Sequence, residues 1–268
     1  MNRPSRLLLL GNPVSHSLSP RIHNAALRTA GIPLEYVAIE VAPAQLKSMM
    51  RSLRTEGAAG NVTVPYKQAV FAICDHVTAI AKRTGAVNTF WVQDGTLVGD
   101  NTDVAGFAFA ARELLESAHA DTPLRVALIG AGGAAAAVAA AVSDWDRTEL
   151  VIWNRDPARA AELAQRFARA RVETDLVEAV KGAELVVNAT PIGMSDDAVP
   201  VQISTLPRRC AVLDLVYRRG ETPWVRAARD AGHPASDGLP MLVEQAARSF
   251  RRWLGVEPNR EVMWDALN

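Results

Sequence analysis

A lysine and an aspartate lie in the two stretches of this sequence that combine charges with hydroxyl and amide side chains. Lys67 ends the run Asn-Val-Thr-Val-Pro-Tyr-Lys at residues 61–67, and Asp103 ends the run Asp-Asn-Thr-Asp at residues 100–103. A carboxylate of the second run can give Lys67 a charged partner, which would make the placement of this lysine special. The ordinary alternatives are a surface lysine and an aspartate that caps the next helix.

Other polar side chains in these regions can recognise a small ligand. Asn61 and Thr63 follow a predicted strand, and α/β proteins usually bind ligands at strand ends. Ser17 and Ser19 precede a helix that has proline at its first position. We expect Ser19 to cap this helix, and the two hydroxyls together can hold a carboxylate at its positive end. Capping alone is the competing interpretation.

A glycine-rich turn predicts a dinucleotide site. Residues 125–135 read Arg-Val-Ala-Leu-Ile-Gly-Ala-Gly-Gly-Ala-Ala, a strand that runs into G-x-G-x-x-A and then a helix. Gly130 permits the tight turn, Gly132 lets the backbone approach a pyrophosphate, and Ala135 is small enough for the helix to pack on the strand. A glycine turn that binds nothing is the alternative, but the strand-turn-helix context favours a nicotinamide dinucleotide.

The next strand of this unit predicts which dinucleotide binds. It ends at Asn154 and Arg155, without the acidic residue that normally binds an adenosine ribose 2′-hydroxyl. Arg155 and Arg159 can instead bind a 2′-phosphate, which favours NADP over NAD. Asp156 weakens this argument, and both arginines can also be read as solvated charges on a surface helix.

Short apolar runs alternate with helical patterns over the first hundred residues, which is typical of β-α-β units. Asp94 and Gly95 form a predicted hairpin turn. We expect strands at 6–10, 34–41, 58–62, 86–92 and 96–98, and helices at 20–30, 43–54, 67–73, 77–83 and 103–117.

A second series follows a short polar stretch at 118–122 that we interpret as a linker. Its near-continuous apolar strands alternate with helices, which indicates a parallel sheet covered on both faces. The fold class is therefore α/β with a Rossmann-type doubly wound parallel sheet. We expect strands at 124–129, 149–153, 184–188 and 210–215, and helices at 134–142, 157–170, 239–254 and 260–267.

Composition narrows the function classes. Lysine plus arginine and aspartate plus glutamate number 29 each, so no global field attracts nucleic acid or a membrane, and a small-molecule partner is expected. The two apolar runs, Leu7–Leu10 and Ala134–Val142, are too short for the roughly 20 residues of a bilayer span.

Cysteines and histidines form no metal pattern. Only Cys74 and Cys210 are present, far apart, which fits a reducing, cytoplasmic compartment rather than a disulfide framework. The five histidines form no HxxxH or HExxH spacing. We expect most of them to be surface or capping residues, with His16 nearest to the candidate site.

Four motifs occur together and in order: Ser-Leu-Ser-Pro at 17–20, Asn-Val-Thr-Val-Pro-Tyr-Lys at 61–67, Gly-Ala-Val-Asn-Thr at 85–89 and Gly-Asp-Asn-Thr-Asp at 99–103. With them the chain resembles the shikimate dehydrogenase family. Further similarity at 130–135, 154–155, 188–190, 214–217 and 238–245 extends the resemblance over nearly the whole length.

The resemblance implies a domain organisation and a reaction. Residues 1–103, completed by C-terminal helices over 238–268, would form a substrate-binding and catalytic domain, and residues 104–237 an NADP-binding Rossmann domain. The active site would lie in the cleft between them. The implied reaction is the reversible NADP-dependent reduction of 3-dehydroshikimate to shikimate, on the way to chorismate and the aromatic amino acids, by a monomer or homodimer.

The resemblance also implies the site residues. Lys67 and Asp103 would be the catalytic pair, and no metal would be needed. Ser17 and Ser19 would hold the substrate carboxylate. The rest of the substrate wall would be Asn61, Thr63, Asn88, Tyr217 and Gln245. Cofactor contacts would come from Gly130, Ala131, Gly132, Gly133, Ala134, Ala135, Asn154, Arg155, Arg159, Thr190, Leu215, Gly238 and Met241.

Two departures from the family pattern affect the cofactor. Pro240 stands where the family usually has glycine, and Asp156 stands where a small hydroxyl residue is common. Proline can change how the loop closes, or can simply begin the next helix. The alternatives to shikimate are quinate or an amino-substituted shikimate within the same superfamily. A non-catalytic metabolite sensor is the alternative from another class, because fold alone does not establish function.

Overall fold

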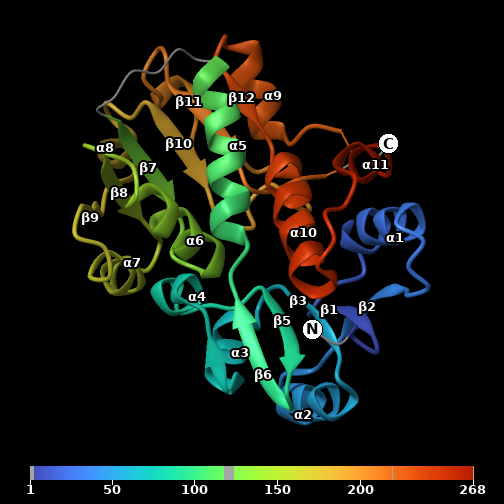
Figure 1. Cartoon of the computed structure of the whole chain (residues 1–268). Coiled ribbons are helices and arrows are strands. Elements are labelled where there is room, and N and C mark those ends of the chain that lie inside the picture. The colour runs from blue at the N-terminus through green and yellow to red at the C-terminus, as the bar shows by residue number, and fades with distance from the viewer. Residues whose placement is uncertain (1–2, 118–123, 219, 268) are drawn as a thin grey trace. The chain divides into compact units, whose positions relative to one another are not determined.

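The computed structural model describes residues 3–117, 124–218 and 220–267, and the chain forms two compact units (Figure 1). The first comprises Met1–Asp103 and Leu242–Asn268, and the second comprises Val104–Met241. The chain returns to the first unit inside helix α10. The expected linker at 118–122 lies outside the described residues.

The first unit is built on a six-stranded mixed sheet with the order β2-β1-β3-β5-β6-β4. β1 pairs in parallel with β2 and β3, whereas β5 pairs antiparallel with β3 and β6. Positive φ at both Asp94 and Gly95, 51° and 73°, makes the predicted hairpin turn between β5 and β6. The strands are β1 (Leu7–Gly11), β2 (Tyr36–Glu40), β3 (Ala59–Val62), β4 (His76–Val77), β5 (Thr89–Gln93) and β6 (Thr96–Asp100).

Helices from both ends of the chain complete this unit, and Figure 1 shows the C-terminal α10 and α11 beside α1. Apolar side chains from the sheet and α2, including Leu8, Met50, Leu53 and Phe90, are at most 1% exposed and form one core cluster. The helices are α1 (Ser19–Thr29), α2 (Leu46–Glu56), α3 (Lys67–Ile73), α4 (Ala79–Thr84), α10 (Leu239–Leu254) and α11 (Arg260–Asp265), with a 3₁₀ turn at Pro43–Gln45.

The second unit contains an entirely parallel sheet with the order β12-β11-β10-β7-β8-β9. This confirms the predicted doubly wound sheet. Its strands are β7 (Arg125–Ile129), β8 (Glu149–Trp153), β9 (Ala170–Val172), β10 (Leu185–Asn188), β11 (Ala211–Asp214) and β12 (Ala235–Ser236). Its helices are α5 (Asp103–Ser117), α6 (Gly133–Val142), α7 (Pro157–Ala164), α8 (Leu176–Val180) and α9 (Pro223–Asp230), with a 3₁₀ turn at Ile203–Thr205.

Several short elements differ from the sequence prediction. The helix expected over 157–170 ends at Ala164, because Ala170 begins edge strand β9 and pairs with Leu150 of β8. Helices α8 and α9 and strands β4 and β12 were not predicted. The Thr222 hydroxyl accepts a hydrogen bond from the backbone N–H of Val225, and Pro223 follows Thr222. This capping signature could have revealed α9.

One local prediction is wrong, and two histidines are exceptions to another. Ser19 does not cap α1, since it is the first helical residue and Leu18 holds the cap position without a side-chain bond. His23 and His233 are not surface residues, being 0% and 8% exposed. The His23 ring stacks on Tyr36 with centroids 4.3 Å apart, and burial lowers its pKa to about 3, so it is a neutral core aromatic. His16 and His76 are exposed, and His119 lies outside the described residues.

No helix within the described ranges is both long and apolar enough to cross a membrane.

Candidate active site

The centre of the candidate site is the ion pair between Lys67 and Asp103. Lys67 is the first residue of α3, which follows β3, and Asp103 is the first residue of α5, which follows β6. The Lys67 Nζ lies 2.5 Å from Asp103 Oδ2, and the side chains are only 14% and 6% exposed. Two charges so largely withdrawn from water must be paired and hydrogen-bonded. The predicted lysine and aspartate are therefore in direct contact.

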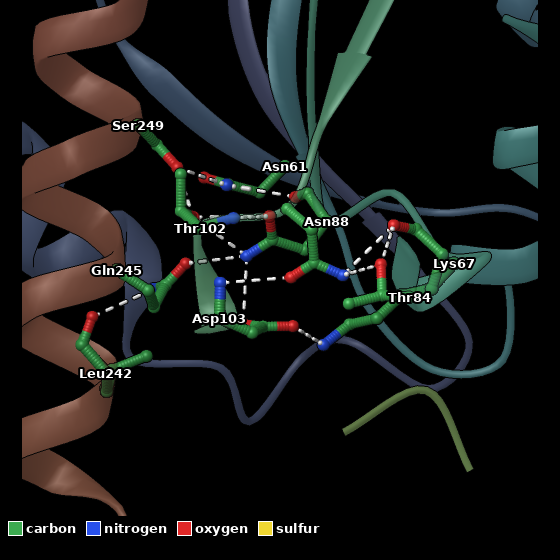
Figure 2. Close-up of polar contacts among 11 residues, drawn as sticks. Asn61, Lys67, Thr84, Asn88, Thr102, Asp103, Leu242, Gln245 and Ser249 are labelled. Atoms are coloured by element: carbon green, nitrogen blue, oxygen red, sulfur yellow. Dashed lines mark hydrogen bonds and ion pairs between the residues drawn. The ribbon is translucent and has the colours of Figure 1, made fainter. Parts of the chain in front are cut away.

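Asn101 fixes the backbone that presents Asp103. Its Oδ1 accepts a hydrogen bond from the Asp103 backbone N–H at 3.1 Å. Its Nδ2 donates to Thr84 Oγ1 at 3.1 Å and to the Ala86 carbonyl at 3.0 Å. Figure 2 shows Asp103 pointing toward Lys67 from this loop. The loop is thus held to α4 and to the chain that enters β5.

The carboxylate of Asp100 anchors the start of the same loop. Its Oδ1 accepts hydrogen bonds from the Asn101 backbone N–H at 2.8 Å and from the Thr78 hydroxyl. Its Oδ2 accepts one from Arg252 of α10 at 2.7 Å. The end of β6 is therefore tied to both α4 and α10.

The Asn88 amide contacts several groups of the candidate site at once. Its Nδ2 donates to Asp103 Oδ1 at 2.8 Å and lies 3.3 Å from Gln245 Oε1, while its Oδ1 accepts the Thr102 backbone N–H at 2.7 Å. A backbone N–H can only donate and a carboxylate can only accept, so these two partners fix the orientation of the amide. Asn88 is 2% exposed.

Asn61 of β3 and Gln245 of α10 lie beside Asn88 and belong to the same expected substrate wall. Asn61 Nδ2 donates to the Asn88 carbonyl at 3.0 Å, and its Oδ1 accepts the Tyr36 hydroxyl at 2.9 Å. Gln245 Nε2 donates to the Leu242 carbonyl at 2.8 Å. Both side chains are under 10% exposed. The structure therefore brings Asn61, Asn88 and Gln245 together with the ion pair (Figure 2).

Ser17, Ser19 and Thr63 lie at the same end of this sheet, since they follow the parallel strands β1 and β3. Ser17 Oγ accepts the Ser19 backbone N–H at 3.2 Å, a local turn that the sequence did not indicate. As an acceptor there, the Ser17 hydroxyl keeps its hydrogen for another partner. Tyr217 follows β11 in the second unit and is half-buried.

The glycine turn in the second unit fits a dinucleotide. Gly130 has φ +118°, and a Cβ there would lie 3.0 Å from the Ala189 carbonyl oxygen, so glycine is required. A Cβ on Gly132 would have no neighbour within 4 Å. Gly132 caps the ten-residue helix α6 without a side-chain hydrogen bond. Open space beside uncapped helix N–H groups suits a phosphate.

Exposed arginines flank the end of β8. Arg155 and Arg159 are both exposed, and guanidinium groups match a phosphate geometrically. The Asp156 carboxylate accepts the Ala158 backbone N–H at 3.0 Å and caps α7. Asn154 Nδ2 donates to the Asp156 carbonyl at 2.8 Å. Helix capping therefore accounts for the unexpected acidic residue.

Asp214 joins the ends of neighbouring strands in the second unit, although the sequence reasoning gave it no role. It is 0% exposed and accepts hydrogen bonds from Asn188 Nδ2 at 2.8 Å and Thr222 Oγ1 at 2.8 Å. Asn188 Oδ1 in turn accepts the Thr190 hydroxyl at 2.6 Å. The expected cofactor residue Thr190 is thus fixed through a buried carboxylate.

The last expected cofactor residues lie in the loops after β11 and β12. A Cβ on Gly238 would lie 2.3 Å from the Leu215 carbonyl oxygen, so these two loops touch. The Leu239 backbone N–H is capped by Asp237 at 3.0 Å. Pro240 therefore sits in the first turn of α10, where its missing N–H costs no helical hydrogen bond. Met241 follows it and is 8% exposed.

The described part of the chain contains no cluster of three or more histidine, cysteine, aspartate or glutamate side chains that could hold a metal ion.

Comparisons with known proteins match most of the chain. A family model described as the shikimate dehydrogenase substrate binding domain matches residues 9–90, one for shikimate/quinate 5-dehydrogenase matches 111–194, and one for the shikimate 5′-dehydrogenase C-terminal domain matches 238–267. A shikimate dehydrogenase (NADP(+)) of Rubrobacter xylanophilus is 45% identical over 97% of this chain and 94% of its own.

Solved structures agree with these matches. The shikimate 5-dehydrogenase of Thermus thermophilus in complex with NADP(H) and shikimate has a TM-score of 0.87 and 38% identity, and 97% of each chain is covered. The quinate dehydrogenase of Corynebacterium glutamicum in complex with NAD also has a TM-score of 0.87, with 31% identity over 99% of each chain.

The buried Asp214 carboxyl makes stability depend on pH. Burial raises its pKa from 3.8 to about 6, against the opposing effect of its hydrogen bonds. Between about pH 4 and pH 6 the folded protein keeps a proton that the unfolded chain has released. The unfolding free energy should therefore fall by up to about 3 kcal/mol as pH rises through this window.

Urea titrations across this pH range on the wild type and Asp214→Asn measure the effect. The pH dependence should flatten in this variant but not in Asp230→Asn, which removes an exposed carboxylate. Equal pH dependence in Asp214→Asn and the wild type would refute the prediction.

Proposed function

The chain belongs to the shikimate dehydrogenase family, and we propose that Lys67 and Asp103 are the catalytic pair of its reaction. That reaction is the NADP-dependent interconversion of 3-dehydroshikimate and shikimate, in aromatic amino acid biosynthesis. The enzyme is an oxidoreductase that acts on a CH–OH group. The observation that carries the proposal is the 2.5 Å contact between the two side chains within a wall of buried amides.

Lys67 moves the proton of the reaction. Its Nζ donates a proton to the ketone oxygen during reduction and accepts it during oxidation. Asp103 orients the ammonium through Oδ2, while Asn88 occupies its Oδ1. NADP, when bound, supplies or accepts the hydride. Neither task of the two side chains requires a metal ion.

The remaining side chains of the first unit bind and orient the substrate. The Ser17 hydroxyl keeps its hydrogen, and the N-terminus of the eleven-residue helix α1 has no side-chain cap. Both features favour a bound carboxylate, so Ser17 and Ser19 hold that group. The ring hydroxyls contact Asn61, Thr63, Asn88 and Gln245 of this unit and Tyr217 of the second.

The two units divide the binding of the two ligands. The first unit, with the C-terminal helices, is the substrate domain, and the second is the NADP domain. Arg155 and Arg159 bind the 2′-phosphate and give the preference for NADP. The other cofactor contacts come from Gly130 through Ala135, Asn154, Thr190, Leu215, Gly238 and Met241.

The protein works as a cytoplasmic monomer or homodimer, without a nucleic acid or membrane partner. Its two cysteines, Cys74 and Cys210, are free thiols, which suits a reducing compartment. Its formal net charge of +0 offers no overall attraction to polyanions.

Replacement of Lys67, the proposed proton donor, should strongly slow turnover. We expect Lys67→Ala to lower kcat for shikimate oxidation by about a hundred- to ten-thousandfold, since a positioned acid/base group contributes that much. Initial rates of absorbance change at 340 nm measure it, with NADP and NAD each crossed with shikimate and quinate. Lys47→Ala, which removes an exposed lysine of α2, should keep wild-type rates.

The same assay separates the alternatives. Fastest turnover of shikimate with NADP supports the proposal, whereas faster turnover of quinate would assign the chain to the quinate branch. Ligand binding without turnover of any pair would favour a sensor. A Lys67→Ala variant as active as wild type would remove the lysine from the chemistry.

The open space at Gly132 provides a test of the cofactor site that does not depend on activity. An alanine methyl group there meets no protein atom, so Gly132→Ala should unfold with a free energy within about 0.5 kcal/mol of wild type. The methyl group would occupy the space of the pyrophosphate, and we expect the Kd for NADP, measured by calorimetry, to rise at least about tenfold.

Gly130→Ala is the matched control, because it should lose stability through its positive φ and the nearby Ala189 backbone. Unchanged NADP affinity in folded Gly132→Ala would exclude this turn as the phosphate site.

A further inference from the structure

Ser249 lies beside the candidate active site on α10 but has no exposed surface. It follows Gln245 by four residues, so both side chains project from one face of the helix. Figure 2 shows the Ser249 side chain pointing from α10 toward Asn61 and Thr102. Because it is 0% exposed, any effect of its hydroxyl on bound substrate must pass through these neighbours.

The hydroxyl joins two parts of the site that are distant in sequence. Asn61 Nδ2 donates to Ser249 Oγ at 2.9 Å, and Ser249 Oγ lies 3.1 Å from Thr102 Oγ1. Asn61 belongs to the substrate wall on β3, and Thr102 immediately precedes Asp103. Ser249 is thus a link between the wall, α10 and the loop that carries the carboxylate.

Fixed donors and acceptors set the direction of the first of these hydrogen bonds. Asn61 Nδ2 also faces the Asn88 carbonyl, which can only accept, so Nδ2 is correctly placed as a donor and Ser249 Oγ accepts from it. Ser249 Oγ and Thr102 Oγ1 share a hydrogen bond in which either hydroxyl can donate. Thr102 Oγ1 in turn contacts the Asn88 amide, 2.9 Å from Nδ2, which donates to it, and 3.2 Å from Oδ1.

The series continues to the ion pair. Asn88 Nδ2 donates to Asp103 Oδ1 at 2.8 Å, and Asp103 Oδ2 accepts from Lys67 Nζ at 2.5 Å. Linked hydrogen bonds polarise one another. One connected series therefore runs from Asn61 through Ser249, Thr102 and Asn88 to Asp103.

We propose that Ser249 is a positioning residue of the reaction, which holds Asn61 and the Thr102 hydroxyl so that Asn88 keeps Asp103 aimed at Lys67. This inference rests on the proposed catalytic function of Lys67 and Asp103. Ser249 touches neither substrate nor cofactor, so its effect falls on the geometry of groups that do. Small displacements of catalytic groups cost large factors in rate.

The test compares variants that interrupt the series at adjacent links. We expect Ser249→Ala and Thr102→Val each to lower kcat for shikimate oxidation by about ten- to a hundredfold. The affinity for shikimate, measured by calorimetry without cofactor, should fall as well, while the KM for NADP stays within about twofold of wild type. Ser249→Cys keeps a weaker donor at similar size and should recover part of the kcat.

The double variant distinguishes a shared series from two separate effects. If both hydroxyls act through one series, Ser249→Ala with Thr102→Val should lose little more than either alone. Thr89→Val is the matched control, because its hydroxyl is also 0% exposed but bonds only the Gly60 carbonyl, at 3.3 Å. It should keep kcat within about twofold of wild type.

Three outcomes would overturn the inference in an active wild-type enzyme. They are an unchanged kcat in Ser249→Ala, losses that multiply in the double variant, and an equal loss in Thr89→Val. Thermal melts check that each variant is folded, and Thr102→Val and Ser249→Cys carry the test if Ser249→Ala does not fold. A wild type without turnover of shikimate would instead contradict the proposed function.

Discussion

The need of one buried carboxylate for hydrogen-bond partners organises the candidate site of the first unit. Asp103 is 4% exposed, and a carboxylate withdrawn from water is stable only if its oxygens are paired or hydrogen-bonded. Lys67 donates to Asp103 Oδ2 and Asn88 donates to Oδ1, while Asn101 accepts a hydrogen bond from the Asp103 backbone N–H. These partners come from α3, the chain before β5 and the end of β6, so the mixed sheet must bring those elements to one end.

The second unit meets a different requirement with different chemistry. A dinucleotide needs open space beside backbone N–H groups, which glycine at 130 and 132 and the uncapped start of α6 provide without charged side chains. Asp214 is buried beside strand ends that precede expected cofactor contacts, where it links Asn188 to Thr222. In each unit, therefore, a buried carboxylate, Asp103 or Asp214, holds loops at the ends of strands in place through hydrogen bonds.

The sequence predicts those features whose causes are local. The hairpin at Asp94 and Gly95 requires two positive φ angles in adjacent residues, and the turn at Gly130 lies between a continuous apolar strand and an alanine helix. The contact of Ser249 with Asn61 joins residues 188 positions apart, so no local sequence pattern predicts this contact. The burial of His23 likewise has no local signal in the sequence, because it depends on Tyr36 and Trp253 from other elements. The residues alone left Lys67 as a surface lysine or the partner of a carboxylate, and the family resemblance of the motifs supplied the expected catalytic role of Lys67 and Asp103.

In the proposed mechanism, hydrogen-bond donation from the Asn88 amide holds Asp103 in place beside Lys67. The most direct measurement is kcat for shikimate oxidation by Asn88→Asp, which keeps the shape of the side chain but replaces the NH₂ group that faces Asp103 with oxygen. We expect kcat to fall at least about a hundredfold in protein that circular dichroism shows to be folded. A folded variant with wild-type kcat would contradict it.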